Sequence, residues 1–224
     1  MSGASIRWLA PSDGPDAFPD PTTALDEPNG LLAAGGALTP EWLIGAYRRG
    51  IFPWFSTGQP ILWWSPDPRS VLDPATFRPS RSLTQSQRNR GYEVRIDSDF
   101  AALVAACAAP REDGVGTWIT AEMRRAYLEL HRLRHAHSFE TWFEGELVGG
   151  LYGVRIGALF CGESMFSRSR DASKVAFARL VQHALETGVR LIDCQLPTPH
   201  LASLGAETVT REGFLGRLPG LIDS

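Results

Sequence analysis

The 224-residue sequence has little of what defines several protein classes. Its three cysteines, Cys107, Cys161 and Cys194, are an odd number without the spacing of a disulfide framework. No apolar run approaches the roughly 18 residues of a membrane span. The N-terminal segment lacks the apolar stretch and small-residue cleavage site of a signal peptide. We therefore predict a cytoplasmic protein with free thiols and no membrane partner.

Motifs for cofactors and metals are also missing. There is no GxxxxGK[ST] phosphate loop, no HExxH motif and no paired-cysteine zinc signature. His131, His135 and His137 lie close together, but solvent exposure or pairing with Glu129 explains them without a metal. The formal net charge of −3 restricts any nucleic-acid contact to a local basic segment. We predict no metal and no nucleotide cofactor.

The composition is that of a globular protein, with 43% hydrophobic and 21% charged residues. The residue composition and its pattern change along the chain. Residues 1–68 are rich in Pro, Gly and Trp, whereas residues 69–224 alternate between strand-like and helix-like patterns. We predict an α+β fold in which a small N-terminal lobe (1–68) precedes a mixed-sheet domain (69–224).

Tryptophans gather in the N-terminal lobe. Trp54, Trp63 and Trp64 lie within eleven residues, in a segment broken by Pro and Gly that no helical period explains. One interpretation is a small aromatic core, because large rings bury well. The other is a platform on which a base or another flat ligand stacks.

A basic strip follows. The segment 80–90 has helix-forming composition with Ser80 as its N-cap, and Arg81 and Arg88 are spaced to share one face. The strip contains few neighbouring acids. It is either a solvated helix face or a surface that contacts phosphates. Its candidate phosphate-contacting residues are Arg78, Arg81, Arg88 and Arg90.

Three successive strands are predicted between residues 138 and 164, the first two joined by a turn at Glu144-Gly145. The glycine pair Gly149-Gly150 falls inside the middle strand. Glycines at such a position mark a bulge or a place where another part of the chain approaches closely.

The stretch from Ala158 to Ala206 carries the candidate site. One strand ends near Glu163, a helix of about four turns follows, and a second strand ends at Asp193 and Gln195. Strands joined by a helix lie parallel, so their polar ends emerge at the same edge of the sheet. We predict that these three side chains line one pocket where the strands part. The plainer alternative is that the acids cap helices or pair with Arg.

The sequence argues against thiol catalysis here. Side chains alternate along a strand, so Cys194 should point away from Asp193 and Gln195, into the core. Gln195 is too weakly basic to be a strong general base, but its amide oxygen can accept a hydrogen bond from an attacking amine and orient it.

A series of motifs then marks a resemblance that runs from about residue 25 to 206. The sequence resembles the leucyl/phenylalanyl-tRNA–protein transferases, the bacterial aminoacyltransferases of the N-end rule. The combination of WWSPDPR, GESMFS and LIDCQ is very specific. The matching motifs are EPNGLLAAGG, YRRGIFPWFS, ILWWSPDPR, GTWIT, AHSFETW, ELVGGLYGV, FCGESMFS, ASKVAF, LIDCQ and HLASLGA.

The resemblance implies transfer of Leu, Phe or Met from aminoacyl-tRNA to the α-amine of proteins beginning with Arg or Lys, which marks them for degradation. It implies an acetyltransferase-like (GNAT-like) second domain that uses neither a metal nor acetyl-CoA. We expect a monomer. Two rival functions are a tRNA- or peptide-binding adaptor without turnover and an acetyl-CoA-dependent N-acetyltransferase. The missing R/Q-x-x-G-x-G/A loop argues against the second.

The resemblance also implies roles for individual residues. Asp193 and Gln195 match the family's catalytic pair. Our hypothesis for the mechanism is that Asp193 fixes the Gln195 amide and Gln195 aligns the amine on the ester carbonyl. Glu163 matches an acid that binds the acceptor. Trp54 and Trp118 match the aromatics that hold the 3′-terminal adenosine. The remaining substrate-binding residues are Leu151, Phe160 and Met165, for the transferred side chain, and Gly162 and Ser164.

Overall fold

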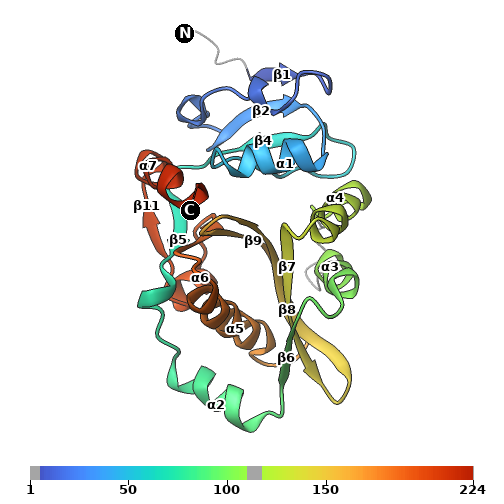
Figure 1. Cartoon of the computed structure of the whole chain (residues 1–224), viewed down its shortest axis with the longest axis vertical. Helices are drawn as coiled ribbons and strands as arrows, with labels where there is room; N and C mark the ends of the chain where they lie inside the picture. The colour runs from blue at the N-terminus through green and yellow to red at the C-terminus, as the bar shows by residue number, and fades with distance from the viewer. Residues whose placement is uncertain (1–5, 110–117, 224) are drawn as a thin grey trace.

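Two β-sheets follow one another along the chain in the computed structural model, which describes residues 6–109 and 118–223 (Figure 1). The first sheet has the order β1-β2-β4-β3 and carries helix α1 (Pro40–Tyr47). The second has the order β11-β5-β10-β9-β8-β7-β6. The predicted α+β fold, with a small first sheet and a larger mixed one, is confirmed.

The strands and helices have the following bounds. The first sheet comprises β1 (Arg7–Leu9), β2 (Leu31–Gly35), β3 (Phe52–Pro53) and β4 (Leu62–Trp64). The second comprises β5 (Arg69–Leu72), β6 (Glu93–Ile96), β7 (Ala136–Phe143), β8 (Glu146–Ile156), β9 (Leu159–Ser167), β10 (Leu191–Gln195) and β11 (Glu207–Val209). The remaining helices are α2 (Arg81–Asn89), α3 (Phe100–Ala108), α4 (Ala121–Arg132), α5 (Ala172–Thr187), α6 (Pro199–Ser203) and α7 (Arg211–Ile222).

The first sheet packs around an aromatic core. The ring of Phe18 meets Trp42 and Trp63 edge to face, with centroids 5.2 and 4.8 Å apart. Trp63 is fully buried, so the aromatic-core interpretation is correct for this residue. Trp54 differs, because its ring is 41% exposed and touches Trp64 edge to face. The cluster therefore contains both core tryptophan and surface tryptophan.

The second sheet lies between helices on both faces (Figure 1). The glycine pair predicted in β8 allows helices to approach this strand closely from both faces. A Cβ built on Gly149 would meet Ala172 of α5 at 2.5 Å, and one built on Gly150 would meet Leu103 of α3 at 2.3 Å. Neighbouring residues of a strand point to opposite faces, so α5 and α3 approach β8 from opposite sides. The predicted close approach is confirmed, and a register shift follows Thr141 on the paired strand β7.

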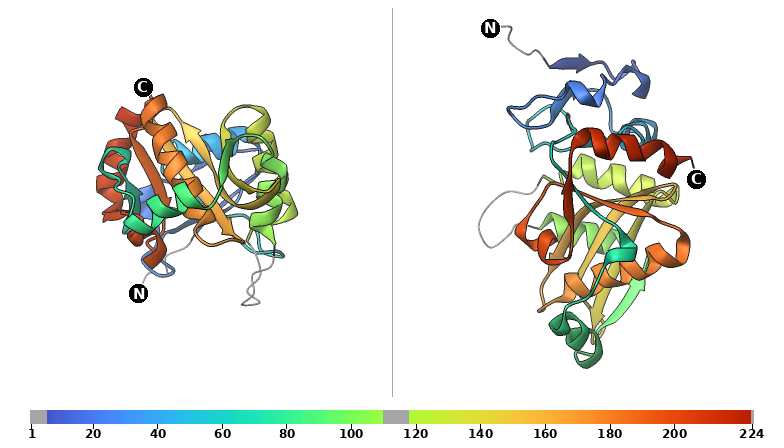
Figure 2. Two further views of the ribbon diagram at one scale, coloured as in Figure 1. Left: turned by 90° about the horizontal axis from the view of Figure 1, so that it is seen from below. Right: turned by 90° about the vertical axis from the view of Figure 1, so that its left-hand side faces the viewer.

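Helix α7 joins the two sheets (Figures 1 and 2). Its residues Phe214, Leu215 and Leu218 pack against Gly50 after α1. At its C-terminal end the carbonyl of Leu221 accepts the N–H of Ala158, before β9. One cluster of buried apolar residues thus continues from the first sheet into the second. Among residues 6–109 and 118–223, no helix combines the length and apolar character needed to cross a bilayer.

Replacing Gly149 by Ala should destabilise the fold by about 1–3 kcal/mol, because the added methyl overpacks the contact with α5. Urea denaturation measures the difference. Gly216→Ala in α7 is the matched control, since a Cβ there meets no described atom within 4 Å. Ala in a helix interior is favoured over Gly by up to about 1 kcal/mol. Equal effects of the two substitutions would contradict the close packing of α5 on β8.

Candidate active site

Strands β9 and β10 run side by side and then separate. They pair in parallel from Leu191 with Leu159 to Asp193 with Cys161, which confirms the predicted arrangement. Strand β9 then continues to Ser167 beside β8, without further pairing to β10. A cavity of about 520 Å³ lies along this divergence, and both Glu163 and Gln195 line it.

Glu163 is the centre of a hydrogen-bonded cluster. Tyr47 of α1 donates to its Oε1 at 2.7 Å, and Tyr127 of α4 donates to its Oε2 at 2.5 Å. The Gln195 Nε2 donates to Oε1 at 3.2 Å. The two tyrosine hydroxyls are also 3.0 Å apart. Donors from α1, α4 and β10 thus converge on one carboxyl group of β9.

The surroundings of Glu163 change its acidity. Removal from bulk water raises the pKa of its carboxyl from the usual value to about 7, and the nearby Asp193 acts in the same direction. The hydrogen bonds from Tyr127, Tyr47 and Gln195 lower the pKa and so offset part of that rise. The group therefore changes charge near neutral pH.

Asp193 acts on the main chain rather than on the Gln195 side chain. Its Oδ1 accepts the backbone N–H of Gln195 at 2.9 Å. Gln195 has a φ of 63°, and the register of β10 against β5 shifts at this point. The expectation that Asp193 fixes the Gln195 amide is wrong, because that amide donates to Glu163 instead. Asp193 holds the strand end from which Gln195 projects.

Asp193 is itself held by a buried ion pair. Arg69 of β5 donates from Nε to Oδ1 at 2.8 Å and from Nη2 to Oδ2 at 2.6 Å. Both side chains are 1% exposed. The guanidinium lies between the rings of Phe52 and Phe214, 4.9 and 4.6 Å from their centroids. Asp193 accordingly does not line the cavity with Gln195, contrary to expectation.

Cys194 packs against a core cluster, as expected, but it also lines the cavity. The left-handed conformation and register shift at Gln195 interrupt the alternation on which our prediction relied, so Cys194 and Gln195 face the same space. Burial raises the pKa of the Cys194 thiol to about 12. A thiol with this pKa stays protonated near neutral pH and is a poor nucleophile.

Most of the cavity wall is apolar. Leu151 and Met165 line it as predicted, as do Gly162 and Ser164. Phe160 does not, because it is 2% exposed and packs against Phe139 in the core. Further apolar side chains of the wall are Phe166, Phe177, Leu180, Ile192 and Leu201.

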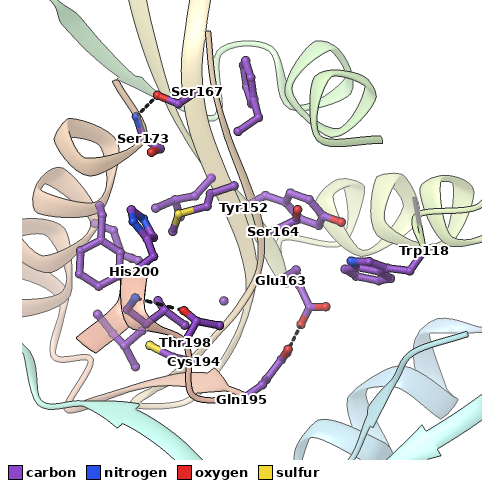
Figure 3. Close-up of a pocket in the computed structure, with 18 residues that line it drawn as sticks. Trp118, Tyr152, Glu163, Ser164, Ser167, Ser173, Cys194, Gln195, Thr198 and His200 are labelled. Atoms are coloured by element: carbon purple, nitrogen blue, oxygen red, sulfur yellow. Dashed lines mark hydrogen bonds between the residues drawn. The ribbon is translucent and has the colours of Figure 1, made fainter. Parts of the chain in front are cut away.

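Of the two tryptophans expected to hold the adenosine, Trp118 lines the cavity and Trp54 does not. Figure 3 shows the ring of Trp118 on one side of Glu163, with Cys194 and Thr198 on the other. Trp54 is not in the wall, although its ring is exposed on the N-terminal lobe. The first two residues of the GTWIT motif that contains Trp118 lie outside the described residues.

His131 and His137 both lie near the carboxylate of Asp97, with Nδ1–oxygen distances of 3.8 and 2.7 Å. His131 stacks on Phe100 and has its Nδ1 2.9 Å from the carbonyl of Ala136. The Nδ1 of His137 is 2.7 Å from a carboxylate oxygen of Asp97. Within the described ranges, no group of three His, Cys, Asp or Glu residues is arranged to hold a metal ion.

Comparison with known proteins identifies the family. The family model for leucyl/phenylalanyl-tRNA–protein transferase matches residues 71–219, and the model for its N-terminal domain matches residues 36–67. The chain is 59% identical over 213 residues to the leucyl/phenylalanyl-tRNA–protein transferase of Azoarcus sp. (strain BH72), covering 95% of this chain and 89% of that protein. With the enzyme of the same name from Pseudomonas fluorescens (strain Pf0-1) it shares 59% identity, over 92% and 91% of the two chains.

This chain belongs to the leucyl/phenylalanyl-tRNA–protein transferase family. The resemblance stated from the motifs is confirmed. Solved structures similar to the chain include a GCN5-related N-acetyltransferase from Kribbella flavida, with 13% identity, a TM-score of 0.42 and coverage of 76% and 61%. Another is a GCN5-related N-acetyltransferase-like protein from Streptococcus suis, with 15% identity, a TM-score of 0.39 and coverage of 76% and 65%.

The basic strip of this transferase-family chain lies on and around α2, at the end of the molecule far from the N-terminal lobe (Figure 1). Ser80 caps α2 as predicted, accepting the Leu83 N–H at 3.2 Å. Arg78, Arg81 and Arg88 are exposed, whereas Arg90 is partly buried with its Nε near Ser86. Among the ion pairs of the described residues, none involves these four arginines.

Sequence reasoning missed three residues of this transferase-family site. Tyr47 and Tyr127 occupy helix positions whose periodicity indicates only core packing, and nothing local marks their hydroxyls as polar partners. Arg69 is the last residue of the WWSPDPR motif, so it belongs to a matching segment but has no role assigned from the sequence. Pairing of an acid with Arg is one of the alternatives that the sequence leaves open, but nothing in the sequence says which arginine.

Replacing Arg69 by Met should destabilise the protein by about 3–5 kcal/mol, because Asp193 would remain as a buried charge without its partner. Urea denaturation measures the loss. R69M/D193N should recover part of it, since no charge is then left unpaired. Arg132→Met is the matched control and should leave the midpoint nearly unchanged, because the Arg132–Glu129 pair is exposed. Equal losses of stability in R69M and R132M would show that breaking the buried Arg69–Asp193 pair costs no more than breaking an exposed pair.

Proposed function

We propose that this chain transfers Leu, Phe or Met from aminoacyl-tRNA to the α-amine of proteins that begin with Arg or Lys, which marks them for degradation. Family membership supports an aminoacyltransferase that uses aminoacyl-tRNA and a protein. The observation that carries the proposal is the contact between Glu163 and Gln195 at the polar end of an apolar cavity. All these groups come from one chain, so the reaction needs no second copy. We place it in the cytoplasm, where both substrates occur.

The transferred side chain would occupy the apolar part of the cavity. Leu151 and Met165, from neighbouring strands, supply part of the wall. The volume of about 520 Å³ lies within the usual range of small-ligand pockets. Apolar pockets discriminate by about 1–3 kcal/mol per methylene, so several unbranched or γ-branched side chains would be accepted. Phe160 would support this wall from behind rather than touch the substrate.

The acceptor would enter beside Glu163 and Gln195. A carboxylate beside the entering chain favours a positively charged N-terminal residue, which supports the preference for Arg or Lys. The aminoacyl ester is already activated, so the reaction is aminolysis, and correct positioning of the amine supplies much of the rate. Gln195 would align the amine on the ester carbonyl, with Asp193 holding the strand end in place.

The 3′ end of the tRNA would be held by stacking. Trp118 lies in the cavity wall next to Glu163, where an adenine attached to the ester could stack (Figure 3). Trp54 offers a second exposed ring from the N-terminal lobe. We propose that the two hold the terminal adenosine, and that Arg78, Arg81, Arg88 and Arg90 contact phosphates of the tRNA body.

A direct assay combines purified protein, Phe-tRNA carrying labelled Phe, and a peptide that begins with Arg. Label should move to the peptide without added cofactor. Acetylation of the peptide when acetyl-CoA is added, without movement of label, would support the N-acetyltransferase. Binding of Phe-tRNA or peptide without any transfer would support the adaptor. Gln195→Ala should lower turnover while leaving aminoacyl-tRNA binding intact. Gln182→Ala on the surface of α5 is the matched control, since its amide donates to Glu186 and Gln182 does not line the cavity. Unchanged turnover in Q195A would remove Gln195 from the mechanism.

The basic strip predicts a different kinetic effect. The double variant R81Q/R88Q should raise the KM for aminoacyl-tRNA and leave turnover at saturation unchanged, because phosphate contacts position the tRNA but not the amine. The slope of log affinity against log salt should become shallower by about one for each arginine–phosphate interaction removed. Arg132→Gln is the control, as this exposed arginine lies on α4. A salt slope equal to that of the unmodified protein would contradict the assignment.

A further inference from the structure

The Glu163 carboxyl lies in the cavity wall beside the Gln195 amide. Two of its hydrogen-bond donors, Tyr47 and Tyr127, hold it from the side of the helices. The third, the Gln195 amide nitrogen, holds it from the opposite strand. Because that nitrogen faces a carboxylate, the amide oxygen of Gln195 is left to accept a hydrogen bond from a substrate.

We propose that Glu163 accepts the proton that the acceptor's α-amine loses during aminoacyl transfer, while Gln195 orients that amine. This inference rests on the proposed function and gives Glu163 a role beyond attracting a basic N-terminal residue. Tyr47 and Tyr127 are positioning residues, because they act on the amine only through Glu163.

The step balances without a further reactant. The neutral amine nitrogen bonds to the ester carbonyl carbon, and the proton it then loses passes to a carboxylate oxygen of Glu163. The bond between that carbonyl carbon and the ribose oxygen breaks. The ribose oxygen takes up the proton from Glu163, which returns to its ionised form. The products are a peptide bond and a free ribose hydroxyl.

The electrostatics around Glu163 suit proton exchange with an amine. A general base works best when its pKa lies near the working pH. The pKa of Glu163, about 7, meets this condition. The titratable groups that face Glu163 carry no positive charge that would hold it ionised. They are Tyr47 of α1, Tyr127 of α4, Tyr152 of β8, Cys161 of β9 and Asp193 of β10.

Other groups near the cavity are less suited to the task. The Asp193 carboxylate is committed to Arg69 and does not reach the cavity. Cys194 stays protonated, because burial raises its pKa to about 12. His200 also lines the cavity, and burial lowers the pKa of its imidazole, so the neutral ring can accept a proton and only its position separates it from Glu163. Figure 3 shows it on the side of the cavity away from Trp118, with Cys194 and Thr198 beside it.

The test measures kcat at saturating Phe-tRNA and Arg-peptide between pH 6 and pH 8.5. Glu163→Gln should lower kcat at pH 8 by about a hundredfold, a usual effect of losing a general base. The ratio of unmodified to E163Q kcat should fall about tenfold between pH 8 and pH 6, because Glu163 becomes protonated below its pKa of about 7. Ionisation of the peptide amine affects both proteins equally and cancels in this ratio.

A second variant tests the same group without removing it. The hydrogen bond from Tyr127 lowers the pKa of Glu163, so Tyr127→Phe should move the acid limb of the kcat profile to higher pH. Tyr92→Phe is the matched control. Its hydroxyl donates to the carbonyl of Arg170, outside the cavity, and its loss should leave the limb in place. Thermal unfolding of each variant checks that the fold is retained.

Three outcomes would overturn the inference. E163Q could raise the KM for the peptide and leave kcat unchanged, which would restrict Glu163 to acceptor binding. The acid limb could stay in place in Y127F, or it could disappear in His200→Ala instead. Absence of transfer by the unmodified protein would be a separate result, because it refutes the proposed function itself.

Discussion

The buried ion pair between Arg69 and Asp193 is the constraint on which the site depends. It joins the first strand of the second sheet to the strand that ends at Gln195. The guanidinium of Arg69 also contacts the rings of Phe52, in the N-terminal lobe, and Phe214, in the last helix. Arg69 therefore connects both of these parts to the second sheet. Buried ion pairs contribute little net stability when complete but are costly to break. Their value here is positional, because Asp193 sets the left-handed turn from which Gln195 reaches the cavity.

Glu163 depends on the same assembly in another way. Its two tyrosine partners come from α1 and α4, which are 80 residues apart at Tyr47 and Tyr127. The carboxyl is thus surrounded only when the N-terminal lobe rests on the second sheet. The pKa of Glu163 therefore depends on how tightly the two lobes pack, because any loosening would admit water and lower the pKa of this carboxyl.

Regular features of the chain could be predicted from the sequence, and irregular ones could not. The parallel pairing of β9 and β10 and the approach of two helices to Gly149 and Gly150 follow from general rules of strand connection and packing. The direction of the Cys194 side chain does not follow from these rules, since a single residue with positive φ, Gln195, interrupts the alternation of the strand. Tyr47 and Tyr127 were missed for a third reason. A buried tyrosine has the helical spacing of a core residue whether or not its hydroxyl has a distant partner.

The order of the strands has a consequence for synthesis of the chain on the ribosome. Strand β5 lies between β10 and β11, so the segment that directly follows the N-terminal lobe pairs only with strands made near the end of translation. Until then Arg69 lacks both Asp193 and Phe214. A nascent chain that stops short of residue 190 lacks β10, and with it Gln195, so the cavity between β9 and β10 cannot form.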